Sequence, residues 1–179
     1  MRLLVFLQGT VTMHRTALGL TRAERVEQSR AGTDPSLLDL VNYVPIGNAV
    51  GKLRCWSAQG AQIDYLTSHR DPHELTHDKG VLVRHGFPCG RILSRGPGQS
   101  YGDVVEQQMP DVLIEDDCES IGACEISYFQ VPAELRRRIR SIIVPEFGGI
   151  DHLSDSVANL ADSARSCGPG KGVGTRPAP

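Results

Sequence analysis

Short runs of apolar residues, each closed by polar turn residues, divide the chain and predict its strands. The first run covers residues 2–7 and ends at Gln8-Gly9-Thr10, which is typical of a buried strand followed by a tight turn. The run at 111–115 is the clearest buried strand, and it leads into the acidic residues Glu115-Asp116-Asp117. The remaining strands are predicted at 61–66, 91–94 and 140–147.

Segments with apolar residues at helical spacing lie between these strands. Thr21 is a candidate N-cap for one helix, and Asp71-Pro72 opens another that ends at Gly86. Further helices are predicted over 46–58, over 101–108, and over the basic run AELRRRIR that precedes the last strand. Because strands alternate with helices, the pattern predicts an α/β fold, a Rossmann-like three-layer sandwich around a mostly parallel sheet.

The composition narrows the class of protein without pointing to a function. The 179 residues suit one α/β domain over residues 1–153, and residues 154–179 predict a weak helix followed by a disordered Gly/Pro-rich tail. A formal net charge of −2 does not indicate nucleic acid or an anionic membrane surface as a partner. No apolar run reaches membrane-spanning length and no signal peptide is evident, so we expect a cytoplasmic protein with its five cysteines reduced.

Polar residues gather where the predicted strands end. In open parallel sheets the functional crevice lies outside the carboxyl ends of the strands, so these residues are expected to converge there. The candidate residues at that edge are Gln8, Gly9, Thr10, Thr67, Ser68, Arg95, Glu115, Asp116 and Asp117. Two simpler readings stay open: Asp116-Asp117 as a helix cap with a first-turn acid, and Thr67-Ser68 as ordinary loop residues.

Three of these strand ends carry a resemblance to a known family. Val5-Phe6-Leu7-Gln8-Gly9-Thr10, Ile63-Asp64-Tyr65-Leu66-Thr67-Ser68 and Val112-Leu113-Ile114-Glu115-Asp116-Asp117 stand in the order of three motifs of the haloacid dehalogenase-like (HAD) superfamily of phosphohydrolases. The chain resembles that superfamily over roughly residues 1 to 150. The resemblance implies the same fold, with residues 11–44 forming a reduced cap between the first strand and the first core helix.

The resemblance also shows which catalytic parts are missing. Phe6 stands at the position of the nucleophilic aspartate, and Gln8 stands at that of the aspartate that serves as general acid and base. Phenylalanine can neither attack phosphorus nor bind Mg²⁺, and an amide does not deliver a proton near neutral pH. The basic residue of the remaining motif is absent at its usual spacing, and Arg95 is the nearest substitute.

We therefore expect a HAD-like protein with a degenerate phosphohydrolase site. It would bind a phosphorylated or nucleotide-like ligand, or a protein partner, without aspartyl-phosphate chemistry. Gln8, Gly9, Thr10, Thr67, Ser68 and Arg95 would contact the ligand, and Asp116 and Asp117, with Glu115 as a further candidate, would hold Mg²⁺ weakly. The alternative is a divergent metal-dependent phosphohydrolase in which metal-bound water attacks at Asp116 and Asp117.

A second motif points to different chemistry. The segment His73-Glu74-Leu75-Thr76-His77 matches H-E-x-x-H, which on a helix places two imidazoles on one face beside a carboxylate, as in zinc hydrolases. Such a site needs a third protein ligand, and Val83 stands where the extended form of the motif has its third histidine. We expect two exposed histidines on a surface helix and no zinc bound to them, and a zinc hydrolase is the minor alternative.

Overall fold

The computed structural model describes residues 1–32 and 39–162, and the sheet lies within them. Five parallel strands form the sheet in the order β5-β4-β1-β6-β7. They are β1 (Arg2–Phe6), β4 (Gln62–Leu66), β5 (Ile92–Leu93), β6 (Val112–Asp116) and β7 (Arg140–Val144). All five predicted strands are therefore confirmed, as is the parallel sheet.

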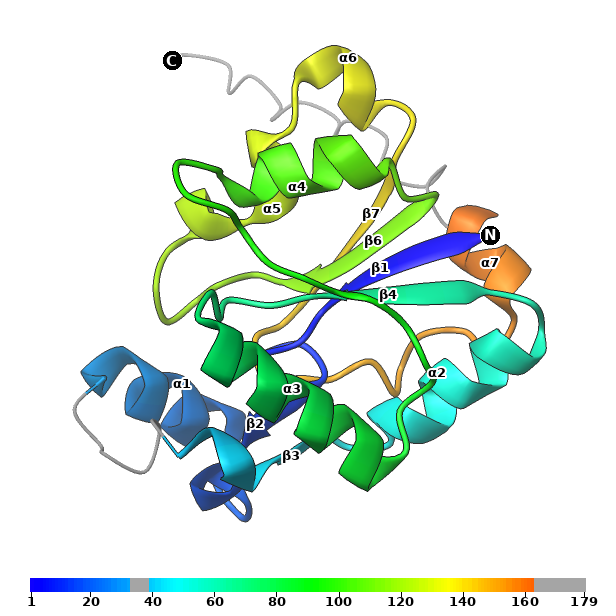
Figure 1. Ribbon diagram of the computed structural model, residues 1–179. Coiled ribbons are helices and arrows are strands. Elements are labelled where there is room, and N and C mark those ends of the chain that lie inside the picture. The colour runs from blue at the N-terminus through cyan, green and yellow to red at the C-terminus, as the bar shows by residue number, and fades with distance from the viewer. Residues whose placement is uncertain (33–38, 163–179) are drawn as a thin grey trace, which may run out of the picture.

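Helices cover both faces of this sheet, which makes three layers (Figure 1). On one face lie α2 (Ala49–Ala58), α3 (Pro72–His85) and α7 (Val157–Asp162). On the other lie α4 (Tyr101–Gln108), α5 (Ser127–Gln130) and α6 (Ala133–Arg136). The predicted α/β sandwich is confirmed, although α6 covers only the first half of the basic run that was expected to be helical.

Strand β1 shows how the sequence produces the two cores. Side chains alternate between the faces of a strand, so neighbouring residues enter different layers. Leu3 and Val5 pack with Leu53 and Trp56 of α2, whereas Leu4 packs with Val104 and Val105 of α4, and all of these side chains are buried. A central strand that is apolar on both faces is what a sheet covered by helices on both sides requires.

A two-stranded antiparallel hairpin follows β1 and leaves the main sheet. It consists of β2 (Thr12–His14) and β3 (Tyr43–Pro45). Between these strands run the 3₁₀ helix η1 (Arg15–Ala17), α1 (Arg22–Ala31) and the 3₁₀ helix η3 (Leu40–Asn42). We refer to residues 11–44, the region predicted as a cap insertion, as the cap segment.

Residues 154–179 were predicted to form a weak helix followed by a disordered tail. Helix α7 occupies part of the region where a weak helix was expected, and the Gly/Pro-rich tail beyond it lies outside the described residues. The 3₁₀ helix η4 (Ala123–Glu125) completes the elements between β6 and α5. Within residues 1–32 and 39–162, no helix combines the length and apolar character needed to cross a membrane.

Candidate functional site

A cavity of about 260 Å³ lies between the carboxyl ends of the strands and the cap segment. The sheet contributes residues that follow or end β1, β4 and β6, among them Phe6, Gln8, Gly9, Ser68, Glu115 and Asp116. The cap segment contributes Met13, His14, Ala17, Arg25, Gln28 and Tyr43. The cavity is therefore at the edge where the sequence predicted the functional crevice, and the cap segment forms its opposite wall.

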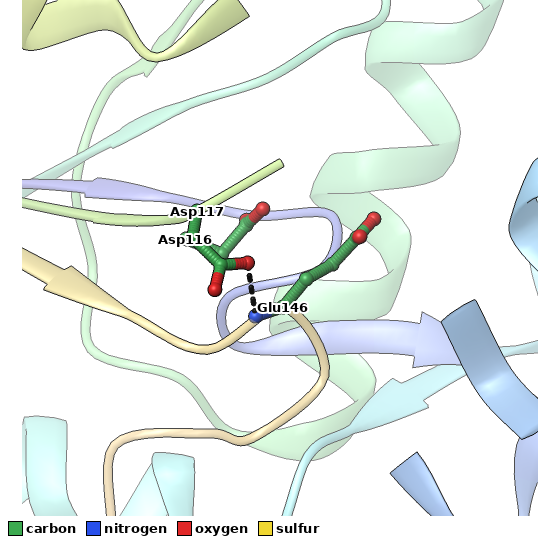
Figure 2. Close-up of side chains that lie close together, drawn as sticks. All are labelled: Asp116, Asp117 and Glu146. Carbon is green, nitrogen blue, oxygen red and sulfur yellow. Dashed lines mark hydrogen bonds between the residues drawn. The ribbon is translucent and has the colours of Figure 1, made fainter. Parts of the chain in front are cut away.

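Three carboxylates converge at this edge, from Asp116, Asp117 and Glu146 (Figure 2). One oxygen of each lies within 4.8 Å of the others, and the backbone N–H of Glu146 donates a 2.9 Å hydrogen bond to Asp117 Oδ1. Asp116 and Asp117 were predicted as metal ligands, whereas Glu146 was missed. It was missed because the last strand was predicted to run to residue 147, whereas β7 ends at Val144 and leaves Glu146 two residues beyond the end of the strand.

Asp116 is buried, with only 5% of its surface exposed, and each of its two carboxylate oxygens accepts a hydrogen bond. The hydroxyl of Thr10 donates to Oδ2 over 2.6 Å, and the N–H of Cys118 donates to Oδ1 over 3.0 Å. Burial raises the pKa of Asp116 to about 6, and the neighbouring Glu146 contributes to the increase. Gly9 packs so closely here, at a φ of +80°, that a Cβ would lie 2.9 Å from Asp116 Oδ2.

Glu146 is held by the loop that follows β6. Its carboxylate accepts hydrogen bonds from Ser120, at 2.7 Å from the N–H and 2.6 Å from the hydroxyl. The backbone next to Glu146 is held as well, because the N–H of Phe147 donates a 2.7 Å hydrogen bond to the carbonyl of Gly9. Glu146 is thus positioned by the turn after β1 and by the loop after β6, which are both distant from it in the sequence.

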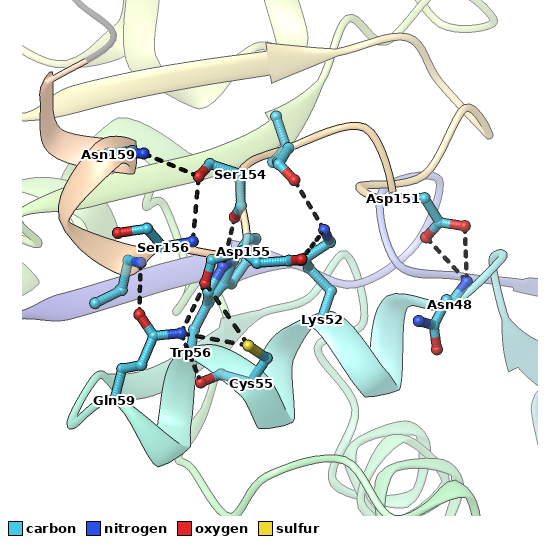
Figure 3. A network of polar contacts seen from close by, with 12 residues as sticks. Asn48, Lys52, Cys55, Trp56, Gln59, Asp151, Ser154, Asp155, Ser156 and Asn159 are labelled. Atoms are coloured by element: carbon cyan, nitrogen blue, oxygen red, sulfur yellow. Dashed lines mark hydrogen bonds and ion pairs between the residues drawn. The ribbon is translucent and has the colours of Figure 1, made fainter.

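A polar network fixes the chain beyond Glu146 to helix α2 (Figure 3). The carboxylate of Asp151 accepts hydrogen bonds of 2.9 and 3.0 Å from the N–H of Asn48. Lys52 Nζ lies 2.5 Å from Asp155 Oδ1, and the Trp56 indole donates to the Ser154 carbonyl over 2.9 Å. This anchoring holds the segment after β7 against the sheet and so supports the position of Glu146.

Arg22 of α1 is the cation nearest to the acidic cluster in the described part of the chain. Its Nη2 lies 3.6 Å from Asp117 Oδ2 and also pairs with Glu119. Its Nε donates to the Glu146 carbonyl over 2.9 Å. The cap segment is therefore docked on the cluster through one guanidinium, which offsets part of the negative charge.

Glu115 has a different role from its two neighbours. Its carboxylate accepts hydrogen bonds from the N–H groups of Ser127 (2.7 Å) and Tyr128 (2.9 Å), at the start of α5. It lines the cavity but is not a member of the three-carboxylate cluster. Asp116 and Asp117 do not cap a helix, because the next helical element along the chain, η4, begins only at Ala123.

The groups predicted to cradle a phosphate are largely engaged within the protein. The side-chain oxygen of Gln8 lies 3.1 Å from the N–H of Ser68 and 3.2 Å from the Thr67 hydroxyl. The Gln8 amide nitrogen donates to Asp78 over 3.1 Å, and the Thr67 hydroxyl donates to the same carboxylate over 2.7 Å. Gln8 and Ser68 line the cavity, but Thr67 is fully buried and faces α3 instead.

Asp78 completes this network, and sequence reasoning did not identify it. It is 6% exposed and also lies 3.0 Å from Nδ1 of His69. The sequence did indicate that Asp78 would be buried, because Val81 and Leu82 follow it by three and four residues. Both are buried core residues on the same face of α3. A carboxylate on an apolar helix face needs several donors, and Gln8, Thr67 and His69 supply them.

Arg95 does not line the cavity. Its guanidinium carbon lies 3.7 Å from the centre of the Tyr101 ring, and the Tyr101 ring meets the edge of Phe6 at a centroid distance of 5.1 Å. Tyr101 and Phe6 are both cavity-wall residues. Arg95 therefore supports an aromatic wall from behind, in place of the predicted contact with a phosphate.

The H-E-x-x-H segment forms the first turns of α3, away from the acidic cluster. His73 and His77 lie on one helix face with ring centroids 4.7 Å apart, but Glu74 accepts hydrogen bonds from the N–H groups of Arg70 and Asp71 as part of a capping box. Among the described residues, the only group of three candidate metal ligands is Asp116, Asp117 and Glu146. The motif therefore lacks a third ligand there and serves as a helix start.

Comparison with known proteins adds no further assignment. No family model matches the sequence, and no curated protein matches it. The resemblance to the HAD superfamily accordingly stays a prediction.

Proposed function

We propose that this protein binds a small phosphorylated ligand in the cavity beneath the cap segment, through a divalent cation held by Asp116, Asp117 and Glu146, without forming an aspartyl-phosphate. One observation carries the proposal. Three carboxylates converge at the carboxyl edge of a parallel sheet, beside a cavity that a separate segment covers, while Phe6 occupies the end of β1. The proposal keeps the resemblance to the HAD superfamily, which rests on the sequence at the three strand ends.

The charges around the cavity make a cation necessary for phosphate binding. Among the described residues that line it, four are acids, which are Glu115, Asp116, Glu125 and Glu146, and one is a cation, Arg25. The Arg25 guanidinium already donates to the carbonyl of Leu20 over 3.0 Å and lies 3.5 Å from that of Phe147. A phosphate dianion entering this site alone would meet net repulsion, since like charges at close range in a partly buried site repel strongly.

The donor set suits a hard divalent cation such as Mg²⁺, which prefers carboxylate oxygens and keeps several waters. The carboxylate oxygens that accept hydrogen bonds from Thr10, Cys118 and Ser120 retain further lone pairs for a metal. A bound cation would supply the positive charge that an anionic ligand needs. Arg22 competes for Asp117, so weak affinity for the cation is expected.

Neither the two residues at the family's aspartate positions nor the neighbouring cysteine replaces the missing nucleophile. Phe6 is inert, and the side chain of Gln8 is engaged with Ser68 and Asp78. Cys118 lies beside the cluster, but burial and the neighbouring Asp116 raise the pKa of its thiol well above the usual range. A thiol without thiolate character is a poor nucleophile, so covalent catalysis through Cys118 is disfavoured.

The proposal includes a cytoplasmic location. The four described cysteines, which are Cys55, Cys89, Cys118 and Cys124, are all free. Free thiols are typical of a reducing compartment, where glutathione and thioredoxin keep cysteines reduced.

The experiment compares binding with turnover. Calorimetric titration of phenyl phosphate in the presence of Mg²⁺ should give binding to the wild type and none to Asp117→Asn. A panel of phosphomonoesters with Mg²⁺, Mn²⁺ or Zn²⁺ should give no phosphate release above that of the variant. Metal-dependent release that is lost in Asp117→Asn would replace the binding role with metal-dependent phosphohydrolysis.

A further inference from the structure

His14 is a buried histidine whose hydrogen bonds indicate which ring nitrogen carries the proton. It lies in β2, is 4% exposed, and forms part of the cavity wall. Its Nδ1 accepts a 3.2 Å hydrogen bond from the backbone N–H of Thr16. Because a backbone N–H can only donate, Nδ1 carries no proton in this arrangement. The neutral ring of His14 therefore carries its proton on Nε2.

A short chain of hydrogen bonds reinforces this tautomer. Gln28 of α1, which also lines the cavity, donates from Nε2 to the Thr16 hydroxyl over 2.9 Å. The Thr16 hydroxyl lies 2.9 Å from Nδ1 of His14 and is left to donate its proton there. The ring plane is fixed as well, because Tyr43 packs against it edge to face at 5.6 Å between centroids. His14 is thus held in one orientation by residues from both ends of the cap segment.

The Nε2–H group of His14 is enclosed, and it meets no hydrogen-bond acceptor within the described residues. Buried donors are nearly always paired, because an unpaired one loses its hydrogen bond to water without replacement. Since the His14 residue belongs to the cavity wall, a ligand bound there is the candidate partner for this nitrogen, once the atoms that enclose it give way.

The rest of the wall defines the ligand that such a donor would recognise. The cavity that His14 lines also has apolar and aromatic side chains in its wall, among them Phe6, Met13, Ala17, Tyr101 and Phe147. The described lining also carries the acids Glu115, Asp116, Glu125 and Glu146, so an anionic acceptor that is not paired with a bound cation would meet repulsion. A volume of about 260 Å³ is slightly below the range of drug-sized pockets, roughly 300–1,000 Å³, so the ligand is small.

We propose that the Nε2–H of His14 donates a hydrogen bond to a neutral acceptor, a carbonyl oxygen or an aromatic ring nitrogen, on the apolar body of the bound phosphate ester. This inference rests on the proposed function for the phosphate end of the ligand. It adds that the cap segment selects ligands by a single neutral acceptor, and that Thr16 and Gln28 are positioning residues that fix the tautomer.

The test uses three probes and two variants. The probes are phenyl phosphate, para-acetylphenyl phosphate and acetophenone, which share an aromatic body and differ in the carbonyl and the phosphate. His14→Asn is the informative variant, since its side-chain oxygen can still accept from the Thr16 N–H while the Nε2 donor is lost. Asp117→Asn disables only the proposed metal end. Affinities come from calorimetry with Mg²⁺, and the His14 ring is followed by nitrogen NMR of histidine-labelled protein.

The proposal predicts that the wild type binds para-acetylphenyl phosphate about ten-fold more tightly than phenyl phosphate. The net free energy of one hydrogen bond to a buried donor corresponds to about that ratio of affinities. That preference should vanish in His14→Asn, and the Nε2 signal of His14 should shift with both carbonyl probes. Equal binding of the two esters in both proteins would overturn the inference and leave the proposed function standing. If acetophenone shifts the Nε2 signal and the phosphate esters bind no more tightly than acetophenone, the result would support the hydrogen bond from His14 and overturn the metal-dependent phosphate site. No response to any probe would overturn both.

Discussion

The side-chain oxygen of Gln8 accepts a 3.1 Å hydrogen bond from the backbone N–H of Ser68. This contact joins the turn after β1 to the turn after β4 inside the protein. It uses an N–H group that the sequence assigned to the ligand, so a phosphate cannot bind there unless Gln8 moves away. The candidate phosphate position therefore shifts towards the other side of β1, where Asp116, Asp117 and Glu146 lie.

Replacing Gln8 should cost stability. Gln8→Ala removes one donor from the buried Asp78 carboxylate and leaves the Ser68 N–H without its acceptor. We expect the free energy of unfolding to fall by about 1–2 kcal/mol, measured by urea denaturation. Gln107→Ala, at an exposed position of α4, is the control and should change it by less than about 0.5 kcal/mol. Equal effects of the two substitutions would show that the Gln8 network is not formed in solution.

Asp116 should make stability depend on pH. Burial raises its pKa in the folded protein to about 6 from an ordinary value of 3.8, so the folded state binds this proton more tightly than the unfolded state. The stabilisation is complete below about pH 4 and is lost as the pH rises through about 6, a change of about 3 kcal/mol.

The measurement compares the wild type with Asp116→Asn. The amide does not titrate, so the difference in unfolding free energy between the two proteins should shift against the wild type between about pH 4 and pH 7. Urea denaturation at several pH values, with Mg²⁺ removed, gives this difference. Parallel pH curves for the two proteins would mean that Asp116 is not perturbed.

Arg22 should weaken the binding of a cation to the acidic cluster. Its guanidinium lies 3.6 Å from Asp117 Oδ2, and its side chain is 38% exposed, so the effect is reduced by solvent. We expect Arg22→Gln to bind Mg²⁺ about two- to five-fold more tightly by calorimetry. Arg138→Gln, an exposed position after α6, is the matched loss of charge and should leave the affinity unchanged. Weaker binding in Arg22→Gln would place the cation elsewhere.

Glu74 should act as a capping residue and not as the base of a zinc site. Glu74→Ala loses the acceptor for the N–H groups of Arg70 and Asp71 and should lower the free energy of unfolding by about 1 kcal/mol. Glu74→Gln keeps an acceptor and should retain most of that stability. Zinc chelation should change neither result, and a chelator that destabilised only the wild type would revive the zinc reading of the motif.

The fold was largely predictable because it follows from short-range patterns. β6 begins with the apolar run Val112-Leu113-Ile114, and α3 begins at an Asp-Pro pair and ends at a glycine, so each element is specified by neighbouring residues. The hairpin of β2 and β3 was not predicted. Its strands have three residues each and pair across the whole cap segment, and such short strands carry no detectable periodicity.

The site was predictable only in part. Asp116 and Asp117 were predicted as candidates because they stand at the end of a buried strand, but Glu146 meets them only through contacts with Ser120 and Asp117 from another loop. Arg95 was assigned to a phosphate on the basis of charge, whereas the structure stacks it on Tyr101. Side-chain direction at a strand end depends on packing from other elements, which a single sequence does not specify.

The most direct test of the central claim is calorimetric titration of inorganic phosphate into the protein with excess Mg²⁺ and with EDTA. The account predicts binding only with Mg²⁺, loss of that binding in Asp117→Asn, and by reciprocity an equal enhancement of Mg²⁺ affinity by phosphate. Phosphate binding of the same strength in EDTA, or binding that survives Asp117→Asn, would contradict a metal-bridged phosphate site at Asp116, Asp117 and Glu146.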